Sequence, residues 1–274
     1  MTAGGASWPT RLVLLGAPVS HSLSPLFQNA ALDAAGIPLR YETLHVEPER
    51  FAERFAELAA SGAAGNVTIP HKEAAAAACD DLTPLARRVG AVNTFWREGG
   101  RTMGDNTDVG GFQALASSLL GDEPGGRRVL LLGAGGAAAA VLAAVAGWPA
   151  SELRVHARTP ERARALASRL DVRCEIAADA PDAAAWADVV VNATPAGLRD
   201  DDADPVPVEW LAADAVVLDL VARRGETAWV RRARQRGLRA ASGLPMLVEQ
   251  GALAFERWFG RAPDRAAMWR AVTG

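Results

Sequence analysis

Four short polar segments in the N-terminal part of the chain contain the side chains best able to do chemistry. They span residues 20–25, 66–72, 90–94 and 104–108, and each falls in a predicted loop or at the end of a predicted strand. Each one alone has a simpler explanation, such as a helix cap or a turn. Together they supply hydroxyls, amides, one amine and one carboxylate, and these are the groups that bind a small polyhydroxylated acid.

Lys72 is the only lysine of the chain, whereas the other 28 of its 29 basic residues are arginine. The chain is also rich in alanine, which indicates a coding bias under which positions that need only a positive charge become arginine. A position that must exchange a proton cannot follow this bias, because guanidinium does not deprotonate in proteins. The dipole of the helix predicted to begin near Lys72 disfavours the ammonium form, and a nearby carboxylate such as Asp108 opposes that effect. The two residues are therefore a candidate pair for moving a proton to or from a substrate oxygen.

A glycine-rich turn follows a predicted strand and precedes a predicted helix, with the sequence Gly133-Ala134-Gly135-Gly136-Ala137. Glycines let the backbone approach a pyrophosphate, and a helix N-terminus offers free N–H groups and a favourable dipole. This context predicts a dinucleotide site rather than a plain turn.

The next strand indicates which dinucleotide binds. An NAD site usually places Asp or Glu at the end of this strand to hold the ribose hydroxyls. Here the strand ends at Ala157 and is followed by Arg158, Thr159 and Arg162. Two guanidinium groups and a hydroxyl suit a 2′-phosphate, so the sequence favours NADP over NAD.

The elements that must position these residues alternate between short apolar strands and longer helical segments, which predicts an α/β fold with parallel sheets. Strands are expected at 11–15, 40–46, 66–69, 91–97, 101–104, 128–132, 153–157, 189–191 and 215–218, with a hairpin at 99–100. Helices are expected at 24–35, 48–60, 135–146, 160–170, 227–236, 244–258 and 264–272, besides the one near Lys72. A Gly- and Pro-containing stretch at 121–126 separates two series of elements and predicts a second domain.

The composition excludes several classes of protein. With 274 residues, half of them hydrophobic, the chain can form one large domain or two modest ones, and global disorder is not expected. A net charge of −3 argues against a nucleic-acid binder. Two distant cysteines exclude a disulfide scaffold and indicate a reduced, cytoplasmic protein. No signal peptide, membrane-spanning stretch or metal-ligand spacing of the histidines is visible, so neither a membrane nor a metal is expected.

Seven motifs, in the same order, make the chain resemble the shikimate dehydrogenase family over nearly its full length. They are Ser22-x-Ser24-Pro25, Asn66-Val67-Thr68-Ile69-Pro70-x-Lys72, Gly90-Ala91-Val92-Asn93-Thr94, Gly104-Asp105-Asn106-Thr107-Asp108, Gly133-Ala134-Gly135-Gly136-Ala137, Asn192-Ala193-Thr194-Pro195-x-Gly197 and Gly243-Leu244-Pro245-Met246-Leu247-x-x-Gln250.

This resemblance implies two α/β domains around a cleft. Residues 1–110 and 243–274 would form the substrate-binding domain, and residues 111–242 a Rossmann-type NADP-binding domain. The implied reaction is the reversible, NADPH-dependent reduction of 3-dehydroshikimate to shikimate by hydride transfer, a step toward aromatic amino-acid precursors. The implied reaction also needs domain closure, and the segments near 121–126 and 241–243 are the candidate hinges.

The resemblance also implies roles for individual residues. Lys72 would be the catalytic lysine and Asp108 its partner, while Ser22 and Ser24 would hold the substrate carboxylate. The ring hydroxyls or the lysine would be contacted by Asn66, Thr68, Asn93 and Gln250. The expected cofactor-binding residues are Gly133, Ala134, Gly135, Gly136, Ala137, Arg158, Thr159, Arg162, Thr194, Leu220 and Gly243, of which Leu220 and Gly243 would lie near the nicotinamide.

Two positions depart from the family pattern. Ala222 stands where the family typically has a tyrosine that reaches the substrate carboxylate, and Ala157 stands where it usually has asparagine. Losing one hydrogen bond to a charged group weakens binding by about 1.5–3 kcal/mol. The change at Ala222 therefore predicts weaker shikimate binding or a slightly different ring acid, unless Arg223 or Arg224 compensates.

Three alternative functions stay open at the level of the sequence. A relative that acts on quinate or an amino-substituted analogue fits the change at Ala222. A non-catalytic NADP-binding regulator is disfavoured by the presence of both Lys72 and Asp108. A folate-type methylene dehydrogenase is disfavoured by the Ser22/Ser24 motif and the 106–108 motif. A monomer and a homodimer are both compatible with the sequence.

Overall fold

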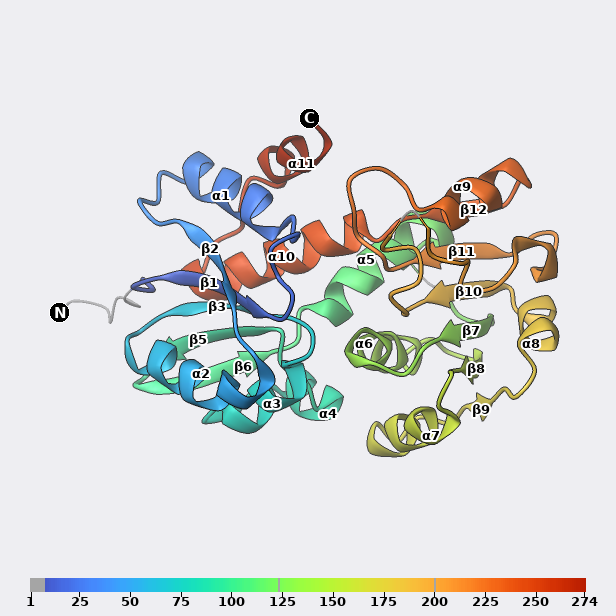
Figure 1. Cartoon of the computed structure of the whole chain (residues 1–274), viewed down its shortest axis with the longest axis horizontal. Helices are drawn as coiled ribbons and strands as arrows, with labels where there is room; N and C mark the ends of the chain where they lie inside the picture. The colour runs from blue at the N-terminus through green and yellow to red at the C-terminus, as the bar shows by residue number, and fades with distance from the viewer. Residues whose placement is uncertain (1–7, 123, 200) are drawn as a thin grey trace. The chain divides into compact units, whose positions relative to one another are not determined.

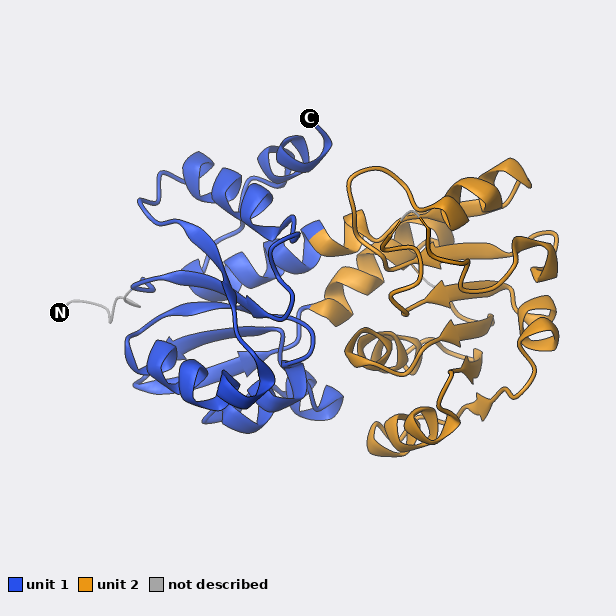
Figure 2. Cartoon of the chain, in the orientation of Figure 1, with its two compact units in different colours: residues 1–107, 248–274 blue, residues 108–247 orange. Residues whose placement is uncertain are grey.

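The structure is a computed structural model, and it describes residues 8–122, 124–199 and 201–274. The chain forms two compact units, shown in Figure 2: Met1–Thr107 with Val248–Gly274 is the first, and Asp108–Leu247 is the second. These divisions lie a few residues from the borders expected at 110 and 243, and the second one falls inside the helix Leu244–Phe259, near its start. Of the segment 121–126, the described residues 121–122 and 124–126 belong to the second unit, between the helix Asp108–Leu120 and the strand Arg128–Leu132, and residue 123 lies outside the described residues.

The first unit is built on a mixed sheet with the strand order β2-β1-β3-β5-β6-β4 (Figure 1). β5 is antiparallel to both β3 and β6, whereas the other strand pairs of this sheet are parallel. The first sheet thus contains the parallel pairs expected from the strand–helix alternation and the antiparallel pair of the expected hairpin, and β3–β5 is a further antiparallel pair. The predicted hairpin is confirmed, because Gly99 and Gly100 adopt φ angles of 56° and 81°, and a two-residue hairpin turn needs positive φ. The strands are β1 (Leu12–Gly16), β2 (Tyr41–His45), β3 (Ala64–Val67), β4 (Asp81–Leu82), β5 (Thr94–Glu98) and β6 (Arg101–Asp105).

Helices cover both faces of this sheet (Figure 1). One face packs against α2 (Phe51–Ala60), α3 (Lys72–Ala78) and α4 (Pro84–Val89), around a core that includes Phe51, Phe55 and Phe95. The 3₁₀ turn η1 (Pro48–Arg50) leads into α2. The other face carries α1 (Ser24–Ala34), α10 (Leu244–Phe259) and α11 (Arg265–Thr273), with α1 packed on α11.

The second unit contains a parallel sheet with the order β12-β11-β10-β7-β8-β9. The strands are β7 (Arg128–Leu132), β8 (Glu152–His156), β9 (Glu175–Ile176), β10 (Val189–Asn192), β11 (Val216–Asp219) and β12 (Arg239–Ala241). The chain runs outward from β7 through β8 to β9 and then returns to the other side of β7 at β10. The strand order therefore reverses between β7 and β10, and ligands of such sheets bind at the carboxyl ends of the strands at this point.

The helices of the second unit also lie on both faces of its sheet (Figure 1). α8 (Ala180–Trp186) and α9 (Ala228–Gln235) pack on one face around the buried Trp229, together with the 3₁₀ turn η2 (Val208–Trp210). α5 (Asp108–Leu120), α6 (Gly136–Val145) and α7 (Pro160–Arg169) lie on the other face, where α5 contacts α6. Residues 138–145 of α6 are all buried, since their small side chains let the helix approach its neighbours closely.

The helix α5 was not among the helices expected from the sequence. It contains Gly110, Gly111, Ser117 and Ser118, which lower helix propensity. The helix forms because Val109, Phe112, Leu115 and Ala116 are buried, so packing outweighs propensity. The shorter elements β4, α4, β9, α8 and β12 were not expected either.

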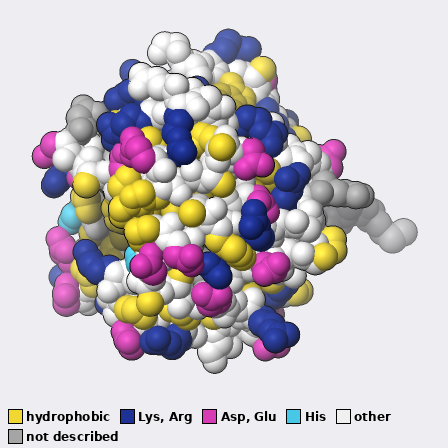
Figure 3. Space-filling model, turned by 90° about the vertical axis from the view of Figure 1, so that its right-hand side faces the viewer, with side chains coloured by type: hydrophobic (Ala, Val, Ile, Leu, Met, Phe, Trp, Pro, Cys, Tyr) yellow, Lys and Arg dark blue, Asp and Glu magenta, His cyan; other side chains and the backbone are white. Residues whose placement is uncertain are grey.

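Two surface observations bear on the partners of the chain. Within the described residues, no helix has the length and apolar character needed to cross a lipid bilayer. On the face shown in Figure 3, arginine side chains are interspersed with acidic ones, and no broad basic field is visible there.

Candidate active site

Of the predicted substrate residues and Lys72, four follow the carboxyl ends of β1 and β3, which are neighbours in the first sheet: Ser22, Ser24, Thr68 and Lys72. The strand order reverses here as well, because β2 lies on one side of β1 and β3 on the other. The two loops are in close contact: a Cβ on Gly16 would lie 2.5 Å from Thr68 Cγ2, so only glycine fits at position 16 without a shift. The segment that leads from β1 toward Ser22 and Ser24 therefore starts in direct contact with the 68–72 segment.

Lys72 is the first residue of α3 and is half-buried. Its carbonyl accepts a hydrogen bond from the Val92 amide at 2.8 Å. The preceding residue, His71, is buried, stacks on Phe51 and places its Nε2 2.6 Å from the Val46 carbonyl. The backbone of the lysine is thus fixed from both sides. Asp108 is the first residue of α5 and is 6% exposed.

Ser22 and Ser24 lie at the start of α1. Ser22 Oγ accepts the Ser24 amide at 3.1 Å, and Ser24 is buried as the first helical residue. The N-cap position itself is Leu23, which makes no side-chain cap. Thr68, which is half-buried, is held through its backbone: its amide donates to Leu15 and its carbonyl accepts from His71.

Asn66 lies in β3, and its buried amide is bonded to other protein groups on both sides. Its Oδ1 accepts the hydroxyl of Tyr41 at 2.7 Å, and its Nδ2 donates to the Asn93 carbonyl at 3.0 Å and to Thr94 Oγ1 at 2.9 Å. Burial raises the pKa of Tyr41 well above its ordinary value, which keeps the phenol protonated as a donor. Tyr41 is the only tyrosine of the chain, but nothing in its own sequence context indicates this role.

Asn93 links the elements of this edge to one another. Its Nδ2 donates to Thr107 Oγ1 at 2.9 Å and to Gln250 Oε1 at 3.1 Å, and its Oδ1 accepts the Thr107 amide at 2.7 Å. Asn93 is 2% exposed and Gln250 is 8% exposed. Three of the predicted substrate residues, Asn66, Asn93 and Gln250, therefore belong to one hydrogen-bonded network.

Strand register explains why these distant residues meet. Asn66 is opposite Thr94 in the β3–β5 pair, and Thr94 is opposite Asp105 in the β5–β6 pair. Asp105 is 2% exposed and accepts hydrogen bonds from Thr83 Oγ1 and the Asn106 amide, and its Oδ2 accepts Arg257 Nε at 2.8 Å. This last bond ties α10, which carries Gln250, to the end of β6. The sequence reasoning missed Thr83, Thr107 and Arg257 in this role.

The glycine-rich turn of the second unit lies at the carboxyl end of β7, beside β10. Gly133 has φ +109°, and a Cβ on it would lie 3.0 Å from the Ala193 carbonyl oxygen. A Cβ on Gly135 would meet nothing within 4 Å, so the backbone there is open to a ligand. Gly136 begins α6, whose first turn has no side-chain cap and no acidic residue. The turn and the helix start, which includes Ala134 and Ala137, therefore fit a pyrophosphate.

Arg158, Thr159 and Arg162 follow β8, the neighbour of β7. All three are exposed, and Thr159 is the N-cap residue of α7 without a side-chain cap. Among the described residues, neither guanidinium has a protein hydrogen bond or ion pair. Both cations are thus available to a phosphate group. Ala157 is half-buried and offers no side-chain hydrogen bond.

The remaining predicted cofactor residues border the same edge of the sheet. Thr194 follows β10, and its amide and Oγ1 bond to Asn192 Oδ1 at 2.9 and 2.7 Å. Leu220 follows β11, and a Cβ on Gly243 would lie 2.3 Å from its carbonyl oxygen, so the chain passes Leu220 in direct backbone contact. Ala222 is half-buried, and Arg223 NH1 lies 3.5 Å from the Gly197 carbonyl.

A buried carboxyl, Asp219, lies at the end of β11, and the sequence reasoning did not single it out. Burial raises its pKa, while hydrogen bonds from Thr227, Val221 and Asn192 act in the opposite direction. The distances to these donors are 2.6 Å from Thr227 Oγ1, 3.1 Å from the Val221 amide and 2.9 Å from Asn192 Nδ2.

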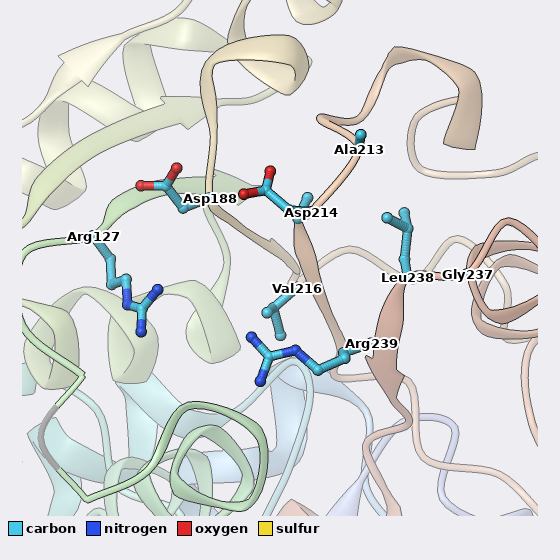
Figure 4. A pocket seen from close by; sticks show the side chains of 9 residues that line it. Arg127, Asp188, Ala213, Asp214, Val216, Gly237, Leu238 and Arg239 are labelled. Atoms are coloured by element: carbon cyan, nitrogen blue, oxygen red, sulfur yellow. The ribbon is translucent and has the colours of Figure 1, made fainter.

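The second unit also has a hollow of about 290 Å³ at the opposite edge of the sheet, at the amino ends of β7, β10, β11 and β12. Figure 4 shows Arg127, Asp188, Asp214 and Arg239 around it. Asp188 is bonded to Arg128 at 2.6 Å. This hollow lies across the sheet from the glycine-rich turn, so it is separate from the dinucleotide edge.

Three family models match the chain. They describe the shikimate dehydrogenase substrate binding domain over residues 14–95, shikimate / quinate 5-dehydrogenase over residues 114–199, and the shikimate 5′-dehydrogenase C-terminal domain over residues 243–273. The shikimate dehydrogenase (NADP(+)) of Rubrobacter xylanophilus is 46% identical over 269 residues, which is 95% of this chain and 94% of that relative.

Solved structures agree with these matches. Shikimate dehydrogenase from Aquifex aeolicus superposes with a TM-score of 0.90 at 33% identity, covering 97% of this chain and 98% of that one. The shikimate 5-dehydrogenase of Thermus thermophilus, in complex with NADP(H) and shikimate, superposes with a TM-score of 0.85 at 40% identity, covering 96% and 98%. Sequence identity at this level over nearly the whole length shows that this chain belongs to the shikimate dehydrogenase family.

Proposed function

We propose that the protein is an NADP-dependent shikimate dehydrogenase, which reversibly reduces 3-dehydroshikimate to shikimate. The observation that carries this proposal is the position of the only lysine. Lys72 begins a helix at the strand edge that also holds Ser22, Ser24 and the Asn66–Asn93–Gln250 network. Curated relatives named shikimate dehydrogenase (NADP(+)) and a solved relative in complex with NADP(H) and shikimate support it.

The residues of the second unit fit NADP. The open backbone at Gly135 and the uncapped start of α6 would hold the pyrophosphate, and Arg158 and Arg162 would hold the 2′-phosphate. When bound, the cofactor supplies the hydride that is added to the ring ketone. Leu220 and Gly243, which are in contact through their backbones, would border the nicotinamide.

The residues of the first unit would bind the ring acid and move the proton. Ser22 and Ser24 would donate hydrogen bonds to the carboxylate. Lys72 would donate a proton from Nζ to the ketone oxygen as hydride arrives at the adjacent carbon, so that the product is an alcohol. Asp108 would accept a hydrogen bond from Nζ and orient it. Asn66 and Asn93 are bonded to other protein groups, so they would act mainly by holding their neighbours in place.

For the ring acid that the enzyme uses as substrate, we propose shikimate rather than quinate. The description of the family model over residues 114–199 names both shikimate and quinate, whereas the relative from Rubrobacter xylanophilus is named a shikimate dehydrogenase. Ala222 offers no side-chain hydrogen bond to a carboxylate, so the carboxylate of either acid would be held by Ser22 and Ser24, and the turnover comparison below decides between the two acids. We propose further that the enzyme acts in the cytoplasm, as a monomer or a homodimer; light scattering would decide the second point.

The test is steady-state turnover of shikimate and quinate with NADP and NAD, followed by absorbance of the reduced nicotinamide. We expect kcat/KM to be highest for shikimate with NADP. Lys72→Arg keeps the positive charge and should lower kcat by roughly 10²- to 10⁴-fold, because general acid–base catalysis contributes about this much. Direct titration should show that the variant still binds NADP.

Two controls complete this test. Arg54→Lys, on the exposed part of α2, exchanges the same two residue types outside the site and should leave kcat unchanged. Arg158→Ala should weaken NADP binding but leave NAD binding unaltered. Substantial turnover by Lys72→Arg would refute the proton-transfer role of the lysine.

A further inference from the structure

The carboxyl edge of the second sheet holds a hydrogen-bonded trio of side chains that are all fully buried: Asn192 at the end of β10, Asp219 at the end of β11, and Thr227 at the N-cap of α9. Asp219 lies between the other two and accepts Asn192 Nδ2 on Oδ1 and Thr227 Oγ1 on Oδ2. Burying a carboxyl group costs free energy unless donors compensate it, so this arrangement needs a reason beyond packing.

Each end of the trio fixes a loop. Asn192 Oδ1 accepts the amide and the hydroxyl of Thr194, and Asn192 Nδ2 also donates to the Ala196 carbonyl at 3.1 Å. Thr194 Oγ1 in turn accepts the Ala196 amide at 3.2 Å. Asn192 thus holds the loop 193–197 through both halves of its amide group.

The carboxyl group holds the next loop in the same way. Asp219 Oδ1 accepts the Val221 amide at 3.1 Å, which sets the path of the chain just after β11, at Leu220. Thr227 accepts the Val230 amide as cap of α9, and its side chain lies 3.4 Å from the position of a Cβ on Gly197. Both loops are therefore tied to a single carboxyl group.

The first of these loops lies beside the dinucleotide turn, and the second lies beside Gly243. The Ala193 carbonyl lies 3.0 Å from the position of a Cβ on Gly133, and the Leu220 carbonyl lies 2.3 Å from that of a Cβ on Gly243. A shift of either loop would therefore change the space next to Gly133 or Gly243. Binding sites depend on such supporting bonds, because a site held too loosely by its surroundings loses affinity.

We propose that Asp219 is the positioning residue of the cofactor site: through Asn192 and Thr227 it sets the loops 193–197 and 220–222 at the spacing that NADP requires. Asp219 does not touch the reacting atoms in this proposal. The inference rests on the proposed NADP-dependent function.

The test is the dissociation constant of NADP, measured by direct titration of Asp219→Ala, Thr227→Val and Thr227→Ser. We expect Asp219→Ala to weaken NADP binding by about tenfold or more, and Thr227→Val by a smaller factor, while the KM of the ring acid stays within about twofold. Thr227→Ser keeps the hydroxyl donor and should bind NADP like the unaltered protein. The comparison of Thr227→Ser with Thr227→Val therefore separates the effect of the lost hydrogen bond on NADP affinity from the effect of a changed side-chain shape.

Asp188→Ala is the matched control, because it removes a hydrogen-bonded carboxyl group at the opposite edge of the same sheet. It should leave NADP affinity within about twofold of the unaltered protein. The proposal is overturned if folded Asp219→Ala binds NADP with an affinity within twofold of the unaltered protein. If Asp219→Ala does not fold, the same result for Thr227→Val overturns the proposal. NADP binding is measured without turnover, so the role of Asp219 and the proposed function are tested separately. If the unaltered protein binds NADP but does not oxidise shikimate, the proposed function is refuted, while the effect of Asp219 on NADP affinity can still be measured.

Discussion

Replacing Asn93 by alanine should destabilise the first unit severely. The substitution removes the acceptor of the Thr107 amide, a 2.7 Å bond at a site where both residues are buried. A buried amide left without a partner costs about 1–3 kcal/mol. The bonds from Asn93 Nδ2 to Thr107 Oγ1 and to Gln250 Oε1 are lost as well, at about 0.5–1.5 kcal/mol each. We therefore expect a loss of about 2–6 kcal/mol in the free energy of unfolding.

Urea unfolding followed by fluorescence would measure this loss, and Asn93→Asp would identify its cause. Aspartate has nearly the same volume but places an oxygen where Nδ2 donates to Gln250 Oε1, so a large loss in this variant cannot come from a cavity. We expect Asn93→Asp to be at least as unstable near neutral pH. Gln235→Ala, at the exposed end of α9, should change stability by less than about 0.5 kcal/mol. A loss below about 1 kcal/mol in both Asn93 variants would show that the network does not support the site.

Three further outcomes test the packing, the turn and the electrostatics. Gly251→Ala should lower the free energy of unfolding by about 1–3 kcal/mol, because its Cβ would lie 2.3 Å from the buried Phe27 ring. Thermal unfolding would measure this loss, and an unchanged Tm would contradict the close packing of α10 on α1. Gly133→Ala should weaken NADP binding about tenfold or more, because φ +109° and the nearby Ala193 carbonyl both disfavour a side chain; affinity within twofold of the unaltered protein would refute this. Asp188→Asn should destabilise the protein near neutral pH and progressively less as the pH falls through about 4. Hydrogen bonds from Arg128 lower the pKa of Asp188 in the folded protein, although burial opposes them. The ionised carboxyl group therefore stabilises the folded state above the pKa of the unfolded chain, and this stabilisation is lost in acid. A difference in stability between the unaltered protein and Asp188→Asn that does not change with pH would contradict this.

Local patterns predicted the parts of the fold that depend on neighbouring residues. The 99–100 hairpin, the helix at 24–34 and the strand–turn–helix around Gly133 follow from glycine and proline positions and from apolar spacing. The helix α5 could not be predicted in this way, because glycines and serines lower its propensity and only burial stabilises it. The antiparallel β5 in the first sheet also depends on pairing partners that lie far apart in the sequence.

In the candidate site too, the residue types could be predicted from local sequence, whereas the contacts between distant residues could not. The polar segments predicted Lys72, Asn66 and Asn93 as candidate site residues and the family resemblance implied Gln250, but neither could predict the contacts among them. Asn93 and Gln250 are 157 positions apart, and the Arg257–Asp105 bond that anchors α10 joins residues 152 positions apart. Tyr41 was not predicted as a site residue, yet its hydroxyl donates to Asn66 Oδ1 from β2, across the intervening strand β1.

The sequence by itself determined which chemistry is present: one amine in a chain of arginines, the glycine-rich turn, and two arginines where an NAD site would have an acid. These are local properties, because proton exchange and backbone freedom depend on the residue type. Only the tertiary structure decided which polar groups are bonded to other protein groups and which are available to a ligand. That distinction depends on strand register and on burial, which make Asn93 and Asp219 supports of the site and leave Arg158 and Arg162 exposed to a ligand.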